Sequence, residues 1–330
     1  MKRMLLPAFL LILTTALSVS SQTTPADTAV LEQGKLVERE ISAGEMHLYN
    51  LTIPAGGYAH VNVDQIGLNI SVSIFVDGKK VRRLDNTTGG DREMFSLAAE
   101  GATTYRVEVL APDKFAQKGK YTIVLKDSRP ATETDKSRVE AEMAFEGAME
   151  LLYKQTKEAR NEAIKKFEQS ASFAQAAKDK SYEARAYYLM AHVYNLLGEF
   201  VKAEETATKA LPIAAVSGNQ SVHAYLFDTI GMSYDSRGLR KKALEFYQQA
   251  LPLRTATDRA GRANTINNIG IVYAWMSERA KAREYLLEAA KMFGELGDRS
   301  KQATVFSTLC VIYNDMSEFN TALEYGNRGL

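Results

Sequence analysis

Apolar and polar residues alternate along the first third of the chain, as in the run Tyr49, Leu51 and Ile53. Successive side chains of a β-strand point to opposite faces, so this period of two predicts half-buried strands. The strands are short and separated by turn residues, among them the pair Asp77-Gly78, which supplies the positive φ angles of a tight hairpin. The pattern therefore predicts an all-β sandwich over residues 22–127.

The apolar spacing changes to about 3.6 after a polar segment, residues 128–136, which reads SRPATETDK. Pro130 lacks the backbone donor that a central strand needs, and the following Thr and Asp residues favour the start of a helix. We therefore expect a linker over residues 128–136 and an all-α region over residues 137–330.

The helical region repeats itself with a period of about 40 residues. The five alanines that mark the repeat are separated by 40, 40, 39 and 40 positions: Ala163, Ala203, Ala243, Ala282 and Ala322. A small residue lies twelve positions before each of the last four, and a tyrosine follows three positions later: Ala191, Gly231, Gly270 and Cys310, then Tyr194, Tyr234, Tyr273 and Tyr313. Small side chains at a fixed interval let antiparallel helices approach closely.

This pattern resembles the tetratricopeptide repeat, with a longer period than the usual one of about 34 residues, as in the group that includes the kinesin light chain. The resemblance implies an α-solenoid of about five helix pairs over residues 137–330. The first unit lacks the small residue and the tyrosine and is expected to be a cap. Leu330 holds the position of Leu211 and Leu251, so the last repeat is expected to be incomplete. Either the natural chain continues, or another copy covers the exposed face and the protein self-associates.

The amino terminus has the layout of a secretory signal peptide. Lys2 and Arg3 precede an apolar run, Met4–Val19, and the small residues Ser20 and Ser21 follow. We expect a signal peptide over residues 1–21, with cleavage before Gln22 and export to the periplasm or the exterior. The run is too short for the roughly 20 residues of a membrane span, so we expect no integral membrane segment after cleavage.

The text LEQGKLVEREISAGEMHLYNLTIPAGGYAHVNV, followed by TTYRVEVL and GKYTIVL, resembles the prepeptidase-carboxy-terminal type of bacterial β-sandwich. Some members of that family bind calcium through aspartates before the central strand, where this chain has Asn69-Ile70-Ser71. We therefore expect no metal. Together with NTINNIGIVYAWMSERAKAREYLLEAAKMF, the layout is similar to the amino-terminal part of bacterial proteins whose repeats lead into a caspase-like CHAT domain.

The composition offers few residues that suit catalysis, metal binding or nucleic-acid binding. There are 41 basic and 40 acidic residues, so the net charge of +1 gives no reason to expect a nucleic-acid partner. The chain has one cysteine and four histidines, and it lacks the usual catalytic and phosphate-binding motifs. Cys310 takes a packing position that Ala or Gly fills in other repeats. We therefore expect no enzyme activity, no catalytic residues and no cofactor.

A curved stack of helix pairs presents its first helices on a concave face, which suits a protein segment or a peptide. Helical geometry predicts that the residues lining this groove are Tyr188, His192, Asn195, Asp228, Met232, Asp235, Asn264, Asn267, Asn268, Ile271, Ser307, Val311 and Asn314. Asn264, Asn267 and Asn268 are the sharpest candidates, because an amide both donates to and accepts from a peptide backbone. Hydrogen bonding between helices is the alternative role.

Two functions remain open from the sequence. In the first, the chain is a non-catalytic exported scaffold that binds a protein or peptide in its groove. In the second, which depends on the family resemblance, it is the regulatory part of a CHAT-type protease-like effector whose catalytic module is absent from this chain.

Overall fold

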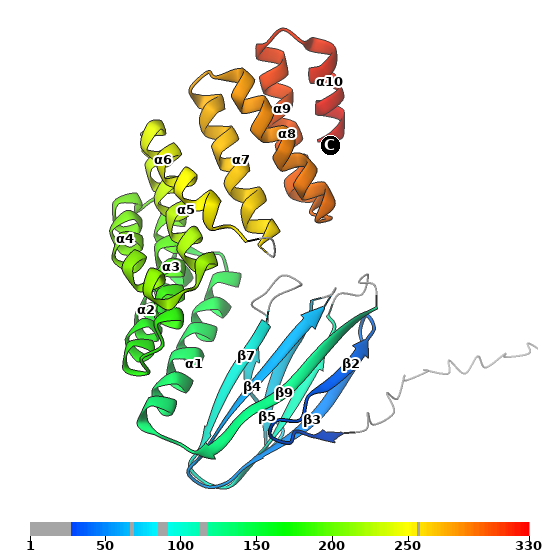
Figure 1. The fold of residues 1–330 in the computed structure, drawn as a ribbon, viewed down its shortest axis with the longest axis vertical. Coiled ribbons are helices and arrows are strands. Elements are labelled where there is room, and N and C mark those ends of the chain that lie inside the picture. Colours follow the sequence, from blue (N-terminus) through cyan, green and yellow to red (C-terminus); the bar gives the residue numbers. More distant parts are fainter. Residues whose placement is uncertain (1–27, 67–68, 85–91, 113–117, 256–257, 330) are drawn as a thin grey trace, which may run out of the picture.

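The computed structural model describes residues 28–66, 69–84, 92–112, 118–255 and 258–329. A β-sandwich comes first and a helical solenoid follows (Figure 1), which confirms the predicted fold class. The predicted signal peptide, residues 1–21, lies outside the described residues. Within the described part of the chain, no helix combines the length and the apolar character needed to cross a bilayer.

The sandwich consists of two sheets of mostly antiparallel strands. The larger sheet has the order β1 (Ala29–Val30), β3 (Met46–Ile53), β8 (Thr103–Leu110), β5 (Ser71–Val76) and β6 (Lys79–Leu84). The smaller sheet has the order β2 (Val37–Ile41), β9 (Gly119–Pro130), β4 (Gly57–Ile66) and β7 (Arg92–Ala99). Asp77 and Gly78 both have positive φ, 49° and 74°, and form the tight turn between β5 and β6.

Alternate residues of both sheets fill the sandwich core, as the period of two predicts. Val61 and Phe95 of one sheet and Val107 of the other are wholly buried. The hydroxyl groups of Tyr49 on β3 and Tyr121 on β9 lie 2.5 Å apart, so a buried hydrogen bond also joins the two sheets. Burial raises the pKa of the Tyr121 hydroxyl, which therefore stays neutral.

The solenoid has five helix pairs among the described residues. The first helices are α1 (Glu133–Tyr153), α3 (Lys180–Leu196), α5 (Gln220–Ser236), α7 (Arg259–Trp275) and α9 (Arg299–Asp315). The second helices are α2 (Lys157–Ala176), α4 (Phe200–Ser217), α6 (Arg240–Ala250), α8 (Arg279–Glu295) and α10 (Phe319–Arg328). A short 3-10 helix, η1 (Leu251–Leu253), follows α6.

Caps recur at the same point of each repeat. Asp179, Asn219, Asp258 and Asp298 precede α3, α5, α7 and α9, and each side chain accepts a backbone N–H of the first turn. Such caps satisfy donors that have no partner inside the helix and stabilise it by about 1 kcal/mol each.

The small residue of each first helix lets the second helix approach closely. The residue that packs against it from the second helix is not always small. A Cβ added to Gly231 would lie 2.7 Å from Tyr247 Cε1, and one added to Gly270 would lie 2.8 Å from Leu286 Cγ. The equivalent pair in α3 and α4 is Ala191 and Ala207, both wholly buried. Each glycine of the first helix thus accommodates a larger residue of the second.

The two parts of the molecule meet with almost no free chain between them. β9 ends at Pro130 and α1 begins at Glu133, so only Ala131 and Thr132 separate them, within the segment 128–136 for which the sequence predicts a linker. Thr132 and Asp135 form a reciprocal capping box. Arg129 of β9 donates to Asp135 Oδ2 at 2.7 Å, which ties the strand to the helix.

Candidate functional site

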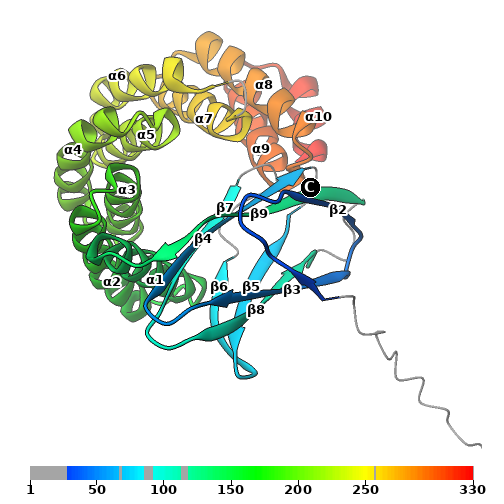
Figure 2. The same ribbon diagram turned by 60° about the horizontal axis from the view of Figure 1, so that its bottom comes forward.

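The helix pairs form an arc with two distinct sides (Figure 2). The first helices α3, α5, α7 and α9 lie on the inner, concave side, and the second helices α4, α6 and α8 lie on the outer side. The curvature follows from stacking similar pairs with a constant small rotation. The concave face is therefore built from the helices on which the sequence predicts the binding residues.

At the start of the arc, Tyr188 and His192 lie one turn apart on α3 with ring centroids 6.4 Å apart. The ring of Tyr188 stacks on Tyr225 of α5 at 5.1 Å. Burial alone lowers the pKa of His192, so its imidazole is neutral near pH 7. These side chains present an aromatic, uncharged surface.

Asn195 is already engaged between two helices. Its Nδ2 donates to the carbonyl of Thr229 at 2.9 Å, and Ser233 donates to its Oδ1 at 2.8 Å. The residue is buried. This amide joins α3 to α5, which is the alternative role that the sequence left open for the asparagines.

A buried charged cluster occupies the middle of the arc. The side chain of Arg254 is fully buried; it donates to Asp258 Oδ2 at 2.6 Å and also pairs with Asp228. The hydroxyl of Thr265 donates to Asp228 Oδ2 at 2.9 Å, and the Arg254 guanidinium lies 4.1 Å from the centroid of the Tyr225 ring. Burial raises the pKa of Asp228 to about 6, while Arg254 and Thr265 act in the opposite direction. Asp228 therefore forms an ion pair inside the protein.

Arg254 is not among the site residues that the sequence predicts, although a charged residue stands out at a repeat position that is apolar in the other units. The equivalent residues of the other second helices are Ala174, Ala214 and Phe293, all buried. An arginine cannot enter that apolar position without a charged partner. In this unit α6 ends at Ala250, after only 11 residues, and the chain turns so that Arg254 reaches the two aspartates.

The three asparagines of α7 differ from Asn195. Asn264, Asn267 and Asn268 are half-buried, and no hydrogen bond joins their side chains to any residue that the structure describes. Their neighbour Ile271 is also half-buried. Amide donors and acceptors therefore stand next to an apolar side chain on the concave helix α7.

The remaining candidates lie on α5 and α9, and those of α9 are less enclosed than those of α7. Met232 is half-buried, and Asp235 forms an ion pair of 3.1 Å with Arg240. Ser307, Val311 and Asn314 of α9 are exposed, and the Ser307 hydroxyl donates to the carbonyl of Ala303 within its own helix.

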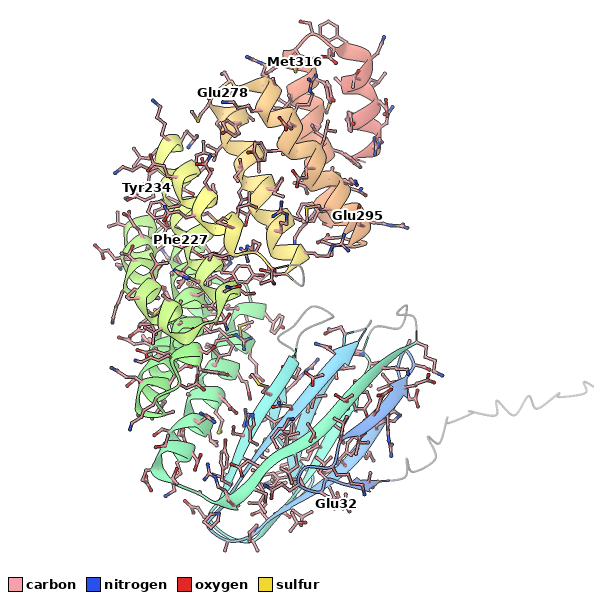
Figure 3. All side chains as sticks on the ribbon, viewed as in Figure 1. Glu32, Phe227, Tyr234, Glu278, Glu295 and Met316 are labelled. Carbon is pink, nitrogen blue, oxygen red and sulfur yellow. The ribbon has the colours of Figure 1, made fainter. Side chains whose placement is uncertain are left out.

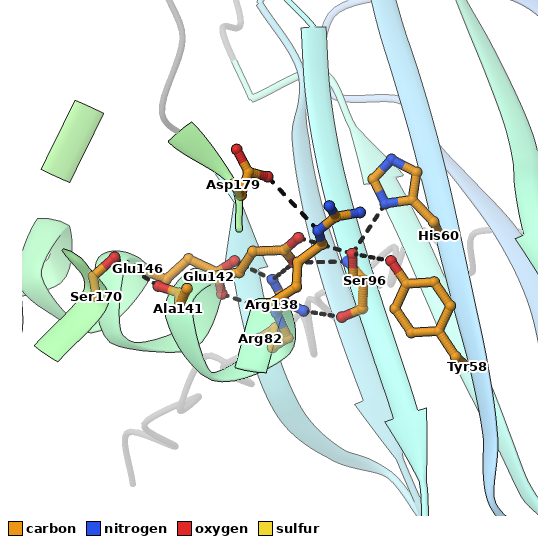
Figure 4. A network of polar contacts seen from close by, with 10 residues as sticks. All are labelled: Tyr58, His60, Arg82, Ser96, Arg138, Ala141, Glu142, Glu146, Ser170 and Asp179. Atoms are coloured by element: carbon orange, nitrogen blue, oxygen red, sulfur yellow. Dashed lines mark hydrogen bonds and ion pairs between the residues drawn. The ribbon is translucent and has the colours of Figure 1, made fainter. Parts of the chain in front are cut away.

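The concave face begins at a polar junction between the sandwich and the solenoid (Figure 4). Arg82 of β6 donates to Glu142 and Glu146 of α1, and Glu142 accepts the backbone N–H of Ser96 on β7 at 2.7 Å. His60 of β4 lies 3.0 Å from the Ser96 hydroxyl, and burial lowers the pKa of its imidazole. These contacts fix the sandwich against α1.

Beside this network lies a pocket of about 150 Å³ to which both parts of the molecule contribute side chains, including His60, Arg138, Asp179 and Arg185. Its walls carry both signs of charge. Arg138 faces Asp179 with Nε and Oδ2 3.6 Å apart.

The described residues offer no group of three His, Cys, Asp or Glu side chains placed to hold a metal ion. Cys310 is half-buried on α9, and a Cβ added to Gly326 of α10 would lie 3.3 Å from its Sγ. It therefore occupies a helix-packing position, equivalent to Gly231 and Gly270.

Comparison with known proteins agrees with the repeat architecture. Two tetratricopeptide-repeat family models match residues 182–256 and 262–296. The photosystem I assembly protein Ycf3 of Rippkaea orientalis is 28% identical over 127 residues, which cover 38% of this chain and 69% of that protein. Ycf3 of Cyanophora paradoxa is 30% identical over 124 residues, covering 38% and 67%.

Solved structures show the same fold. The aspartyl phosphate phosphatase F of Bacillus subtilis superposes with a TM-score of 0.51 at 18% identity, over 59% of this chain and 51% of that one. A Rap protein complexed with Competence and Sporulation Factor gives 0.50 at 19% identity, over 58% and 53%. The chain thus spans about half the length of these two structures and about two thirds of the Ycf3 proteins. Through its helical part, the chain belongs to the tetratricopeptide-repeat family.

Proposed function

We propose that this protein is a non-catalytic, exported scaffold that holds an extended segment of a partner protein against the concave face of its repeats. The observation that carries this proposal is the group Asn264, Asn267 and Asn268 on α7, whose amides bind no described residue. Tetratricopeptide repeats act as scaffolds for protein–protein interactions. A Rap protein of the same fold was solved with Competence and Sporulation Factor.

The chemistry of the face favours contacts with peptide backbone over contacts with charged side chains. Arg254 pairs with Asp228 and Asp258 inside the cluster, and Asp235 pairs with Arg240. The amides of α7 and the apolar side chain of Ile271 beside them take part in no ion pair among the described residues and can contact a partner. An extended peptide offers a donor and an acceptor at almost every residue, which amides can match.

Site-specific photo-crosslinking tests this proposal. A photoreactive side chain at Ile271 is expected to cross-link a partner segment, and the triple change Asn264→Ala, Asn267→Ala and Asn268→Ala is expected to abolish the cross-link. Gln248→Ala and Gln249→Ala remove exposed amides from the outer helix α6 and serve as the matched control. An unchanged cross-link in the asparagine variant contradicts the site.

Export is the second part of the proposal and rests on the signal-like sequence of residues 1–21. We expect the mature protein to begin at Gln22, within a few residues. Mass spectrometry of the protein purified from its native host tests this directly. A mature chain that retains Met1 and the apolar run contradicts export by cleavage.

A further inference from the structure

The solenoid has a second exposed surface, at the edge where first helices turn into second helices. Figure 3 shows Tyr234, Glu278 and Met316 along this edge, on the side of the solenoid remote from the sandwich. Large apolar side chains are exposed along it, among them Leu239 at 45% and Trp275 at 67% in neighbouring repeats. Side chains of this size are usually covered when they lie together, so their exposure requires a reason.

Around these residues lies a shallow pocket of about 360 Å³. The residues that line it are Gly238, Leu239, Arg240, Lys241, Lys242 and Met276. Trp275 borders it, since the Arg240 guanidinium lies 5.4 Å from the centroid of its ring. Three cations and no acid therefore surround an apolar floor made by Leu239 and Met276.

The other repeats show what is unusual here. The residue that precedes the second helix is Glu199, Glu278 or Glu318 before α4, α8 and α10, but Leu239 before α6. Glu199 pairs with Lys202 and Glu278 with Lys281, both at 2.6 Å.

The equivalent lysine of α6 is Lys242, and no described carboxylate pairs with it. Its Nζ lies 5.2 Å from the centroid of the Tyr234 ring, a contact that Lys202 and Lys281 also make with their tyrosines, so the missing glutamate is the difference. Arg240, Lys241 and Lys242 thus stand on the first turn of α6, at the positive end of the helix dipole. Asp235 pairs with Arg240, whereas no described carboxylate pairs with Lys241 or Lys242.

We propose that this surface docks an acidic segment of a partner protein. A bulky apolar side chain of the partner fills the pocket between Leu239 and Met276, and a neighbouring carboxylate pairs with Lys242, in place of the glutamate that the other repeats supply themselves. The favourable charge comes from the partner, because the pocket rim is wholly basic. The surface is separate from the concave face and does not depend on the function proposed for it.

The charges along this edge favour a short protein segment as the partner over an extended anionic surface. Glu278 and Glu318 lie at the corresponding turns of the next two repeats. These carboxylates pair with Lys281 and Arg283, so a bilayer or a nucleic acid broad enough to span several turns gains little attraction there. A short segment reaches the basic pocket alone.

Trp275 is the single tryptophan of the chain and therefore reports on this surface without a label. The probe is an eight-residue peptide with one central leucine flanked by aspartates and glutamates, added to the full-length protein. We expect the emission of Trp275 to move to shorter wavelength as the indole is covered. A peptide with alanine in place of leucine, and one with lysines in place of the acids, are expected to leave the emission unchanged.

The decisive variant is Leu239→Glu, which gives α6 the glutamate that precedes α4, α8 and α10 and supplies Lys242 with an internal partner. We expect the variant to fold normally and to bind the acidic peptide at least about tenfold more weakly. Lys242→Glu is expected to act in the same direction. Val201→Glu adds the same charge beside the start of α4, one repeat earlier, and is expected to leave binding unchanged.

Three outcomes overturn the proposal. They are an unchanged spectrum with the acidic leucine peptide, equal binding by the folded Leu239→Glu variant, and an equal spectral change with vesicles of phosphatidylglycerol. The last of these assigns the surface to membranes instead.

Discussion

Nη2 of Arg82 on β6 lies 2.9 Å from Oε2 of Glu142 on α1, and this contact joins the sandwich to the solenoid. Both side chains are buried, with exposures of 2% and 5%. Glu146, one turn later, pairs with the same guanidinium. The single arginine therefore pairs with two carboxylates between the two parts of the molecule.

Arg82→Leu is expected to destabilise the protein by about 3–5 kcal/mol, because it leaves both buried carboxylates without their cation. Urea unfolding followed by circular dichroism measures the loss. Lys120→Ala is the control, since its ion pair with Glu38 is exposed and is expected to contribute at most about 1 kcal/mol. Equal effects of the two changes contradict this role of the junction.

Gly231→Ala is expected to destabilise the protein by about 1–3 kcal/mol, because the new Cβ would lie 2.7 Å from the buried ring of Tyr247. The gain of Ala over Gly in a helix, about 0.5–1 kcal/mol, offsets part of this cost. Combining it with Tyr247→Ala recreates the pair Ala191 and Ala207 of the preceding repeat. A thermodynamic cycle over the three variants tests the contact, and strictly additive effects argue against it.

Arg254→Ala is expected to cost about 3–5 kcal/mol, because Asp228 and Asp258, whose side chains are only 14% and 12% exposed, would lose their cation. Adding Asp228→Asn removes one of the two charges and is expected to recover part of the loss. Urea unfolding of the single and double variants provides the measurement. If the double variant is as unstable as the sum of its parts, the cluster does not act as a unit.

His192 is expected to make stability depend on pH. Burial lowers its pKa in the folded protein below the ordinary value of 6.5, so the unfolded chain binds more protons in that range. The contribution to stability is present above pH 6.5 and is lost as the pH falls through 6.5 towards the folded pKa.

His192→Gln removes this titration and is expected to show a smaller loss of stability between about pH 7.5 and about pH 5.5 than the native protein. Urea midpoints at the two pH values test this expectation. An identical pH response in both proteins shows that His192 is not responsible.

The architecture could be predicted from local signals. A period of two becomes strands because side chains of a strand alternate, and small residues every 40 positions become stacked helix pairs because only small residues allow close approach. The inner helices of the arc follow from the same repeat. These features depend on spacing within one or two repeats, which the sequence shows directly.

The details of the candidate site could not be predicted in the same way. Asn195 and Asn267 have the same residue type on equivalent helices, yet the first bonds to Thr229 and Ser233 and the second binds no described residue. Their difference depends on which neighbours reach them from the next helix. Spacing along one helix does not contain that information.

By itself, the sequence determined the two-part fold, the repeat length and the helices that face inward, because each depends on backbone geometry and the periodic placement of small and apolar residues. Only the tertiary structure decided that Arg82 joins the sandwich to α1 and that Arg254 lies buried between Asp228 and Asp258 in the middle of the arc. Both are buried charges. A buried charge is stable only where distant segments bring it a partner, and that meeting is a property of the folded chain.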